Sequence, residues 1–418
     1  MFQRWTLSQY ATYLLITLFF LSSWTDVNGI YAQLPQIVLT QPESWKLGAN
    51  LALITNLGNI GPFSLVLYKC LCQKRAINPV PINYIVILIG MLSCFLMIFF
   101  WSYTTTIGNE KRSTALLILA FFLSLLDCTS SISFADYMHR FRKEFTSAIF
   151  LGESLTSILP SLLAIAQGNG QIHCIQSANS TNTTEAIYET ARFSVSIYFL
   201  CLFILLTISF VSYVLLQWTT IGQSSYQTDA DTLSNEPTES IDKPLTRFSY
   251  ILLLLGCAFT SSVLFGMTLS ISTYVLMPYG HRIFYLGTII SPWMLTLVWI
   301  FGMVKPLLSK RYLLILIIIG SLAFAFDLFV SFKSPCPPWV DTTKGSVLIL
   351  IIWLSTYIFL GYPRLVIANY ARIHSTNGMF WYGVNVQFGA LTGSVVAYLL
   401  IDTFGLFHER RACEQIVC

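Results

Sequence analysis

Residues 10–38, YATYLLITLFFLSSWTDVNGIYAQLPQIV, form the first long apolar stretch of the chain, and polar residues interrupt it near its middle. Asp26 and Asn28 lie at bilayer depth if this stretch crosses a membrane. A carboxylate or a carboxamide is costly there against lipid, and it persists where it faces a bundle interior or a water-filled path. The stretch therefore predicts a membrane helix that lines something polar.

The composition of the whole chain agrees with a membrane protein. Of 418 residues, 55% are hydrophobic and only 10% are charged, against about 25% charged residues in soluble domains. The mean hydropathy is +0.68. The net charge of +4 is small and spread out, and no Lys/Arg cluster interleaves with aromatic residues, so we expect no nucleic-acid partner. Residues 1–23 resemble a secretory signal but lack a small-x-small cleavage site, so we expect them to be retained.

The apolar stretches predict an all-α polytopic membrane protein with about 11 transmembrane helices. A bilayer crossing takes about 20 apolar residues. The expected spans are residues 10–38, 48–70, 81–103, 113–135, 145–167, 193–217, 247–275, 283–304, 311–332, 346–369 and 378–405. We expect interruptions of these helices at Gly29, Pro62, Pro160, Pro292 and Pro363.

The longest polar loop divides the chain into six helices and five. Residues 218–246 are rich in Ser, Thr, Asp and Glu, a composition typical of a disordered linker. We therefore expect an N-terminal bundle at 1–217, a cytoplasmic linker at 218–246, and a C-terminal bundle at 247–418 that ends in a cysteine-containing tail.

Three signals predict the orientation. The loops on the side of the N-terminus contain more Lys and Arg, which indicates a cytoplasmic N-terminus and an extracellular C-terminus. Asn179 and Asn182 begin adjacent glycosylation sequons in a loop on the opposite, outer side. Disulfide bonds persist on that side, and their connectivity stays open from sequence. The candidate disulfide cysteines there are Cys174, Cys336, Cys413 and Cys418.

Helical spacing gives the first span two polar faces. Trp24, Asn28 and Tyr31 are spaced i, i+4, i+7 and share one face, whereas Asp26 and Gln33 lie nearly opposite. A helix with polar groups on both sides is surrounded by protein or water, so we expect it to be central. The alternative is that one face only bonds to neighbouring helices.

Other predicted spans also contain polar residues. Two buried acids, Asp127 and Glu153, could serve proton coupling, or they could hold the bundle together by capping backbone groups or pairing with Arg364. Gly389 and Gly393 are spaced for close helix contact. The remaining polar side chains that we note in the spans are Asn56, Asn59, Asp327 and Gln387.

The pattern favours transport of a neutral solute over an enzymatic reaction. Enzyme motifs, a Gly-rich phosphate loop and a metal-type His/Cys spacing are absent from the sequence, so we expect neither a metal nor a cofactor. Few cations lie deep in the spans, so amides and aromatics suit a neutral solute. A flat ring could stack on Trp24, Tyr31, Trp381 or Tyr382, although these side chains could also be interfacial anchors.

Several motifs along the chain resemble one family. They include Trp24-x-x-x-Asn28-Gly29-x-x-x-x-Leu34-Pro35, Asn59-Ile60-Gly61-Pro62, Leu126-Asp127-Cys128-Thr129-Ser130-Ser131, Gly152-Glu153-x-Leu155, Ser334-Pro335-Cys336-Pro337 and Val386-Gln387-x-Gly389. In this order they resemble the eukaryotic riboflavin transporters, solute carrier family 52.

The resemblance implies uptake of riboflavin across the plasma membrane by a two-bundle, alternating-access protein. The implied fold is like that of the equilibrative nucleoside transporters and the major facilitator superfamily, and we expect a monomer. Another neutral ring-containing solute, or a multi-span receptor, stays as an alternative. The candidate substrate-binding residues are Trp24, Asn28, Tyr31, Gln33, Asn59, Asp127, Glu153, Tyr274, Tyr362 and Gln387.

The chain departs from the family pattern at several positions. The family has an acid where Gln33 stands and a small hydroxyl where Asp26 stands. Phe265 and Leu269 stand where Asn and Pro are frequent. These departures leave pH dependence and affinity open.

Overall fold

The chain folds into a helical protein in the computed structural model. The structure describes residues 6–71, 78–168, 172–176, 184–188, 191–226, 246–304, 309–374 and 378–410. Within these residues, ten helices are long and apolar enough to cross a membrane, and Leu7–Ser23 is a shorter apolar helix. The predicted all-α, multi-span fold class is therefore confirmed, while the expected number of eleven spans is approximate.

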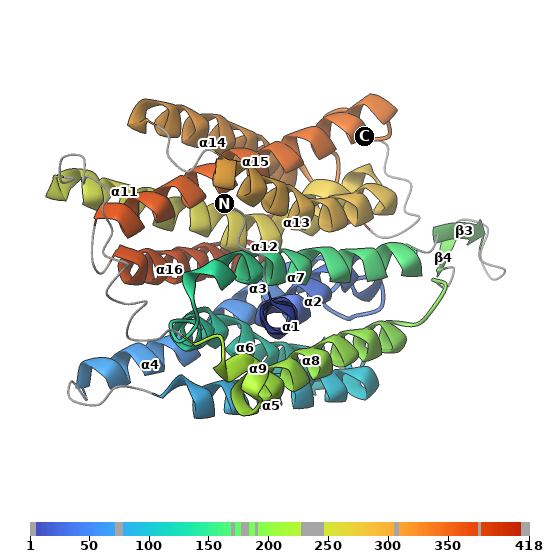
Figure 1. The fold of residues 1–418 in the computed structure, drawn as a ribbon. Helices are drawn as coiled ribbons and strands as arrows, with labels where there is room; N and C mark the ends of the chain where they lie inside the picture. The colour runs from blue at the N-terminus through green and yellow to red at the C-terminus, as the bar shows by residue number, and fades with distance from the viewer. Residues whose placement is uncertain are drawn as a thin grey trace.

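The first half of the chain contains the helices up to α9 and two small hairpins (Figure 1). Its elements are α1 (Leu7–Phe19), η1 (Phe20–Ser23), α2 (Thr25–Ile37), η2 (Ser44–Lys46), α3 (Leu47–Leu57), α4 (Ile60–Leu71), α5 (Pro79–Phe100), β1 (Thr105–Ile107), β2 (Glu110–Arg112), α6 (Thr114–Met138), η3 (Lys143–Phe145), α7 (Thr146–Gln167), β3 (Ile172–Gln176), β4 (Thr184–Tyr188), α8 (Val195–Trp218) and α9 (Thr220–Gln223). The strands pair in antiparallel hairpins, β1 with β2 and β3 with β4.

The second half contains α11 (Arg247–Ser261), η4 (Ser262–Met267), α12 (Thr268–Leu276), η5 (Met277–Tyr279), α13 (His281–Val304), α14 (Lys310–Lys333), α15 (Thr343–His374), α16 (Gly378–Tyr398) and η6 (Leu399–Thr403). Among these, η4 and η6 are π-helical turns. Such turns often mark functional or strained positions in a helix, and the sequence pattern did not reveal them.

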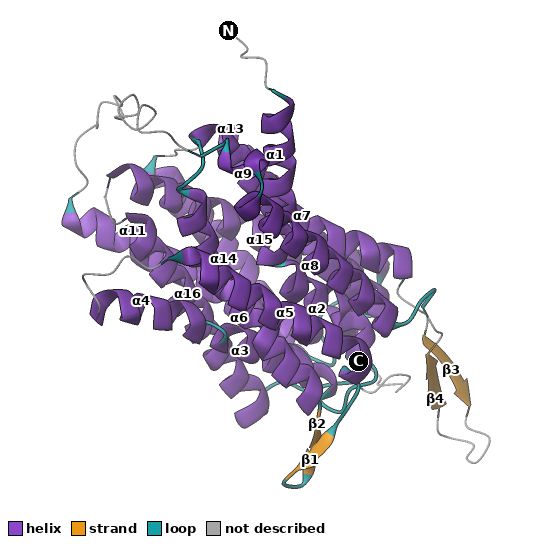
Figure 2. Ribbon diagram, turned by 60° about the horizontal axis from the view of Figure 1, so that its bottom comes forward, coloured by secondary structure: helices purple, strands orange, loops and turns teal. Residues whose placement is uncertain are grey.

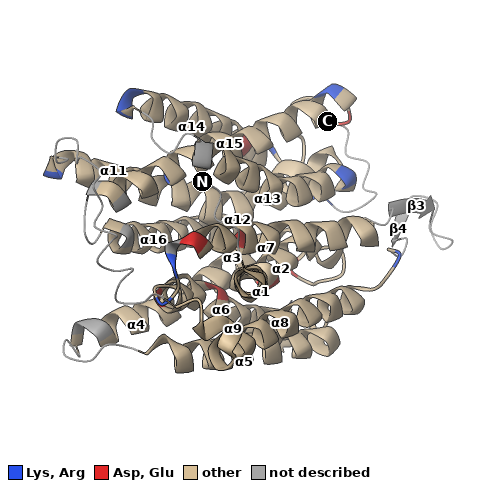
Figure 3. Cartoon of the chain, viewed as in Figure 1, with Lys and Arg blue, Asp and Glu red and all other residues tan. Residues whose placement is uncertain are grey.

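Apolar stripes cover the outside of the helices. On α8, Ile197, Leu200, Ile204 and Ile208 are exposed at helical spacing, while Phe199 and Leu202 are buried. Exposed apolar side chains at this spacing suit a lipid environment, because the backbone polar groups are satisfied within the helix. Figure 3 shows the same division, since the helices are mostly uncharged along their length and Lys and Arg lie mainly near their ends.

The helices of each half pack mainly with one another. In Figure 1 the blue-to-green helices fill the lower part and the yellow-to-orange helices the upper part. We call α1–α9 the N-bundle and α11–α16 the C-bundle. The predicted limits 1–217, 218–246 and 247–418 remain a prediction, because residues 227–245 of the linker lie outside the described residues.

The two ends of the chain lie on opposite faces of the molecule. Figure 2 shows the start of α1 at one end of the molecule and β1 and β2 at the other. We call the face near Thr6 the N-terminal face and the face with β1, β2 and Glu409 the tail face.

The expected interruptions are corrected by the structure. The first span breaks at Trp24, where φ is −147°, and Gly29 lies inside α2. A Cβ at Gly29 would overlap the Leu202 side chain, so this glycine serves close packing rather than a break. The second span breaks at Gly58 and Asn59, between α3 and α4, rather than at Pro62. Pro62 lies in the first turn of α4, where its missing N–H costs nothing.

The other expected interruptions lie inside continuous helices. Pro160 is within α7, Pro292 within α13 and Pro363 within α15. In each case the helix continues past the proline. A bundle permits this when neighbouring groups satisfy the carbonyl that the proline leaves free.

Two glycines of α16 allow the close contact that their spacing predicted. A Cβ at Gly389 would overlap the Ala258 carbonyl, and one at Gly393 would overlap the Ser262 carbonyl. The backbone of α16 therefore lies directly against that of α11 and η4.

Candidate functional site

The break in the first span places Trp24 in the wall of a cavity. Trp24 ends η1 and precedes α2, and its carbonyl accepts the first hydrogen bond of α2 from the Asn28 N–H (3.1 Å). The indole is half-buried. The break therefore turns a large aromatic side chain away from the core of the N-bundle.

The cavity has a volume of about 390 Å³ and opens toward the N-terminal face. At that end Thr146 and His139 are exposed. Pockets for drug-sized ligands measure about 300–1,000 Å³, so a compact ring compound fits. The lining residues are Phe20, Ser23, Trp24, Ser130, Ser131, Ala135, Met138, His139, Phe141, Arg142, Thr146, Ile149 and Glu153.

The partly open face of α2 continues from this cavity. Trp24, Asn28 and Tyr31 are each half-buried, whereas Asp26 and Gln33 have no exposed surface. The two predicted faces of this helix are therefore distinct in the structure. Because α2 contacts α6, α7 and α8 on one side and α13 on the other, it is a central helix.

Asn28 joins α2 to α7 at a proline. Pro160 has no N–H, so the Thr156 carbonyl four residues earlier lacks its helical partner. The Asn28 Nδ2 group donates to that carbonyl at 3.3 Å and also lies 3.3 Å from the Ser157 hydroxyl. Asn28 thus supports the cavity wall, in line with the alternative that this face bonds to neighbouring helices.

The next polar residues of α2 also have protein partners. The Tyr31 hydroxyl lies 3.4 Å from the Thr55 hydroxyl on α3. Gln33 is buried, and its Nε2 donates to Gln167 Oε1 at 2.6 Å. Gln33 therefore faces away from the cavity, within the N-bundle.

Asp26 and Asp127 form a pair in the core of the N-bundle. Both side chains have no exposed surface, and both reach the same backbone N–H group. The Val27 N–H donates to Asp26 Oδ1 (3.2 Å) and to Asp127 Oδ2 (3.3 Å). Two carboxyl groups this close together in an apolar core repel each other when both are charged. Asp127 therefore does not line the cavity; with Asp26 it caps the N-terminus of α2.

This arrangement predicts opposite outcomes for two Asp26 variants. Asp26→Asn keeps the shape of the side chain and places an N–H donor beside the Asp127 carboxyl group, so the variant should fold and reach the membrane. Asp26→Leu leaves the Asp127 carboxyl buried without that partner, which should destabilise the protein by about 1 to 3 kcal/mol. Thermal unfolding of the purified variants measures the difference. Equal stability of the two variants would contradict the pairing.

Of the other candidate residues, only Glu153 lines the cavity with Trp24. Asn59 lies at the break between α3 and α4, and neither atom of its buried amide has a hydrogen-bond partner among the described residues. Tyr274 packs edge-on against Trp45 (5.7 Å) at the tail face, and Tyr362 packs against Phe301 (5.4 Å). Gln387 is half-buried in α16.

The cysteine and glycosylation predictions fall mostly outside the described part. Cys336 is disulfide-bonded. Asn179, Asn182, Cys413 and Cys418 lie outside the described residues, and only the backbone of Cys174, in β3, is described. The pairing of the cysteines stays a prediction.

Sequence reasoning missed part of the cavity wall. Ser131, Ala135 and His139 are exposed at i, i+4 and i+8 along α6 and form one side of the cavity. Their small and polar character at helical spacing was the available signal. Arg364 was considered only as a partner for the acids, but its guanidinium lies over the Phe265 ring at 4.4 Å. Glu153 and Arg364 are not among the ion pairs of the described residues.

Hydrogen bonds join the two bundles on the tail-face side of the molecule. His281 Nε2 lies 2.8 Å from the Pro35 carbonyl, and the Tyr285 hydroxyl donates to the Ala164 carbonyl at 2.8 Å. The Thr273 hydroxyl donates to the Trp45 carbonyl at 2.7 Å. A polar cavity between membrane helices, open at one face and closed at the other, is typical of a transporter.

Comparison with known proteins agrees with this geometry. The family model described as "Solute carrier family 52, riboflavin transporter" matches residues 8–243 and 220–409. The chain belongs to this family. Solute carriers are transporters rather than enzymes, as the sequence motifs indicated.

Curated relatives match along nearly their whole length. Riboflavin transporter member 3-A of Danio rerio is 30% identical, over 95% of this chain and 96% of the relative. Member 3 of Homo sapiens is 26% identical, over 96% of this chain and 98% of the relative. Human member 1 is 27% identical, over 96% of both chains.

Solved structures are similar in fold at low sequence identity. The nucleoside transporter NupG has a TM-score of 0.54 at 12% identity, covering 96% of this chain and 92% of its own. A D-xylose-proton symporter has a TM-score of 0.56 at 15% identity, covering 94% and 89%. These similarities show that the chain has the fold of a multi-pass membrane transporter.

Proposed function

We propose that this protein takes up riboflavin across the plasma membrane by alternating access, with the substrate bound between the two bundles near the bilayer midplane. The observation that carries the proposal is the cavity beside Trp24, which the N-bundle lines, together with the hydrogen bonds that join the bundles toward the tail face. The names of the relatives supply the substrate, and the cavity supplies a site of suitable size.

The chemistry of the cavity suits a neutral flavin. The half-buried Trp24 indole offers a face on which the isoalloxazine ring can stack. Ser130, Ser131 and Glu153 offer hydroxyl and carboxylate groups for the ribityl hydroxyls. The unpartnered Asn59 amide lies at a helix break of the same bundle, and a buried amide of this kind requires a partner such as a solute or water. Tyr31 and Asn28 extend the polar path along α2.

The orientation follows from the distribution of charge along the sequence. Lys and Arg are more frequent in the loops on the N-terminal face, which favours the cytoplasmic side for that face. The C-terminal tail, Cys336 and the two sequons then lie on the extracellular side. For this orientation we infer an inward-open arrangement.

Uptake of labelled riboflavin into cells that express the chain tests the proposal. We expect saturable uptake that unlabelled flavins compete with and nucleosides do not. Competition by nucleosides alone would favour a nucleoside-like solute. No uptake above that of control cells, with the protein present at the surface, would reject riboflavin as the substrate.

Asn28 offers a sharp test of the cavity wall. Asn28→Ala removes the donor that satisfies the Thr156 carbonyl, and Asn28→Asp keeps the shape of the side chain without that donor. We expect both variants to reach the surface and to reduce riboflavin uptake about tenfold, which corresponds to about 1.4 kcal/mol. If Asn28→Asp transports normally, the donor is unimportant and the assigned role is wrong.

A further inference from the structure

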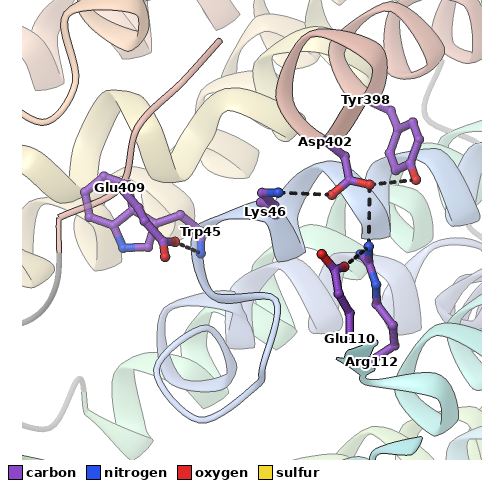
Figure 4. A network of polar contacts seen from close by, with 7 residues as sticks. All are labelled: Trp45, Lys46, Glu110, Arg112, Tyr398, Asp402 and Glu409. Atoms are coloured by element: carbon purple, nitrogen blue, oxygen red, sulfur yellow. Dashed lines mark hydrogen bonds and ion pairs between the residues drawn. The ribbon is translucent and has the colours of Figure 1, made fainter. Parts of the chain in front are cut away.

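The tail face contains a network of charges that crosses from one bundle to the other (Figure 4). Asp402, on η6 of the C-bundle, lies 3.5 Å from Lys46 Nζ and 3.7 Å from an Arg112 Nη atom, and both cations belong to the N-bundle. The Tyr398 hydroxyl donates to Asp402 Oδ2 at 2.9 Å. We call Lys46, Arg112 and Asp402 the tail-face clasp.

The carboxylate of the clasp is well shielded. The Asp402 side chain is 11% exposed, against 40% for Lys46 and 25% for Arg112. Ion pairs of exposed single residues contribute little to stability, but shared and partly buried charges that form a network contribute more. One carboxylate that is held by its own tyrosine and shared between two cations meets that condition.

The N-bundle side of the clasp is firmly attached. Two hydrogen bonds fix the loop before Lys46 to the start of α6. The Ser113 N–H donates to Glu43 Oε1 at 2.6 Å, and the Ser113 hydroxyl donates to Gln41 Oε1 at 2.6 Å. Arg112 is held by Glu110 within the same hairpin at 2.6 Å. A movement of the N-bundle therefore carries both cations with it.

An apolar contact lies beside the clasp. Trp45 is 5% exposed, and its ring packs against Tyr274 of the C-bundle. The backbone N–H of Trp45 donates to Glu409 Oε2 at 3.4 Å. Opening of the tail face must separate both the Trp45 contact and the clasp. The Trp45–Tyr274 contact stabilises the closed face by burying apolar surface. The ion pairs stabilise it only while the two bundles hold the relative position in which the charges are close.

We propose that the tail-face clasp is a gate that holds this face closed while the cavity is open to the N-terminal face, and that Asp402 is the residue whose release from Lys46 and Arg112 lets the bundles part. The proposal rests on the proposed function insofar as alternating access requires such an opening.

Reaction of an introduced cysteine tests the gate without any substrate. Ser270, on α12, has no exposed surface, and its backbone faces Gly48 of α3, so Ser270→Cys reports separation of the bundles. In intact cells a membrane-impermeant maleimide should label this cysteine slowly. Addition of Asp402→Asn should raise the labelling rate about threefold or more, because loss of both ion pairs shifts the closed population toward the open one.

Three further variants distinguish a specific gate from a general weakening of the packing between the bundles. Lys46→Gln and Arg112→Gln each remove one ion pair and should raise the rate by less than Asp402→Asn does. Adding either substitution to Asp402→Asn should raise the labelling rate little further, because Asp402→Asn already removes both ion pairs. Lys111→Gln is the matched control, because Lys111 is exposed in the same hairpin and is not among the ion pairs of the described residues, and it should leave the rate unchanged.

An unchanged rate in Asp402→Asn, with the protein at the cell surface, would overturn the gate. If that variant does not reach the surface, unchanged rates in both Lys46→Gln and Arg112→Gln would overturn it instead. Failure of the unmodified chain to take up riboflavin would reject the proposed substrate and leave the labelling result valid.

Discussion

Replacement of Trp24 by alanine should reduce riboflavin uptake by about tenfold or more at limiting substrate, while the protein still reaches the cell surface. Trp24 is half-buried at the helix break and forms part of the cavity wall. Loss of its stacking face and of the apolar area that a flavin would cover corresponds to about 1.5–3 kcal/mol. Initial uptake rates, normalised to surface protein, measure this effect.

Two variants control this experiment. Trp24→Phe keeps an aromatic face and should retain a substantial part of the uptake. Trp218→Ala removes an equally large side chain that is 71% exposed on α8, away from the cavity, and should transport normally. Normal uptake by Trp24→Ala would show that riboflavin does not bind beside this residue.

The second large effect concerns stability. Gly389→Ala should sharply reduce the amount of folded protein and its melting temperature, because the new Cβ overlaps the Ala258 carbonyl of α11. A backbone atom cannot move aside as the end of a flexible side chain can. Overpacking of this kind costs about 1–3 kcal/mol, and sometimes more. Thermal unfolding of the purified protein in detergent measures the effect.

The same helix provides the matched control. Gly383 also lies in α16, but a Cβ there would meet no atom within 4 Å. Gly383→Ala should therefore be neutral or slightly stabilising, since alanine favours the helix by about 1 kcal/mol over glycine. Equal destabilisation by both substitutions would mean that helix propensity, rather than the contact between α16 and α11, determines the outcome.

The sequence predicted the fold well because the signals of membrane helices are local. Long apolar stretches and the motif order were sufficient for the fold class and the family, and the expected count of eleven spans was approximate. The positions of the breaks were harder to predict. Proline and glycine marked the candidates, but the actual breaks are at Trp24 and at Gly58–Asn59, where the local backbone depends on packing between helices.

The site was predicted only in part because its members meet through tertiary contacts. Trp24 and Glu153 were proposed because each is a conspicuous residue in an apolar stretch, and both line the cavity. Asp127 was predicted to bind substrate, but its carboxyl group accepts from the Val27 N–H, 100 positions away in the sequence. Helical spacing within one segment cannot reveal such a partner. The spacing did separate the two faces of α2, because exposure along one helix is a local property.

The central claim is that riboflavin binds in the cavity beside Trp24. Titration of the purified protein with riboflavin, followed by flavin fluorescence, tests it most directly, because stacking on an indole quenches a flavin. We predict saturable quenching with the unmodified protein and its loss, or a clearly weaker affinity, in Trp24→Ala. Absence of saturable quenching with the unmodified protein, or identical quenching in the variant, would contradict the claim.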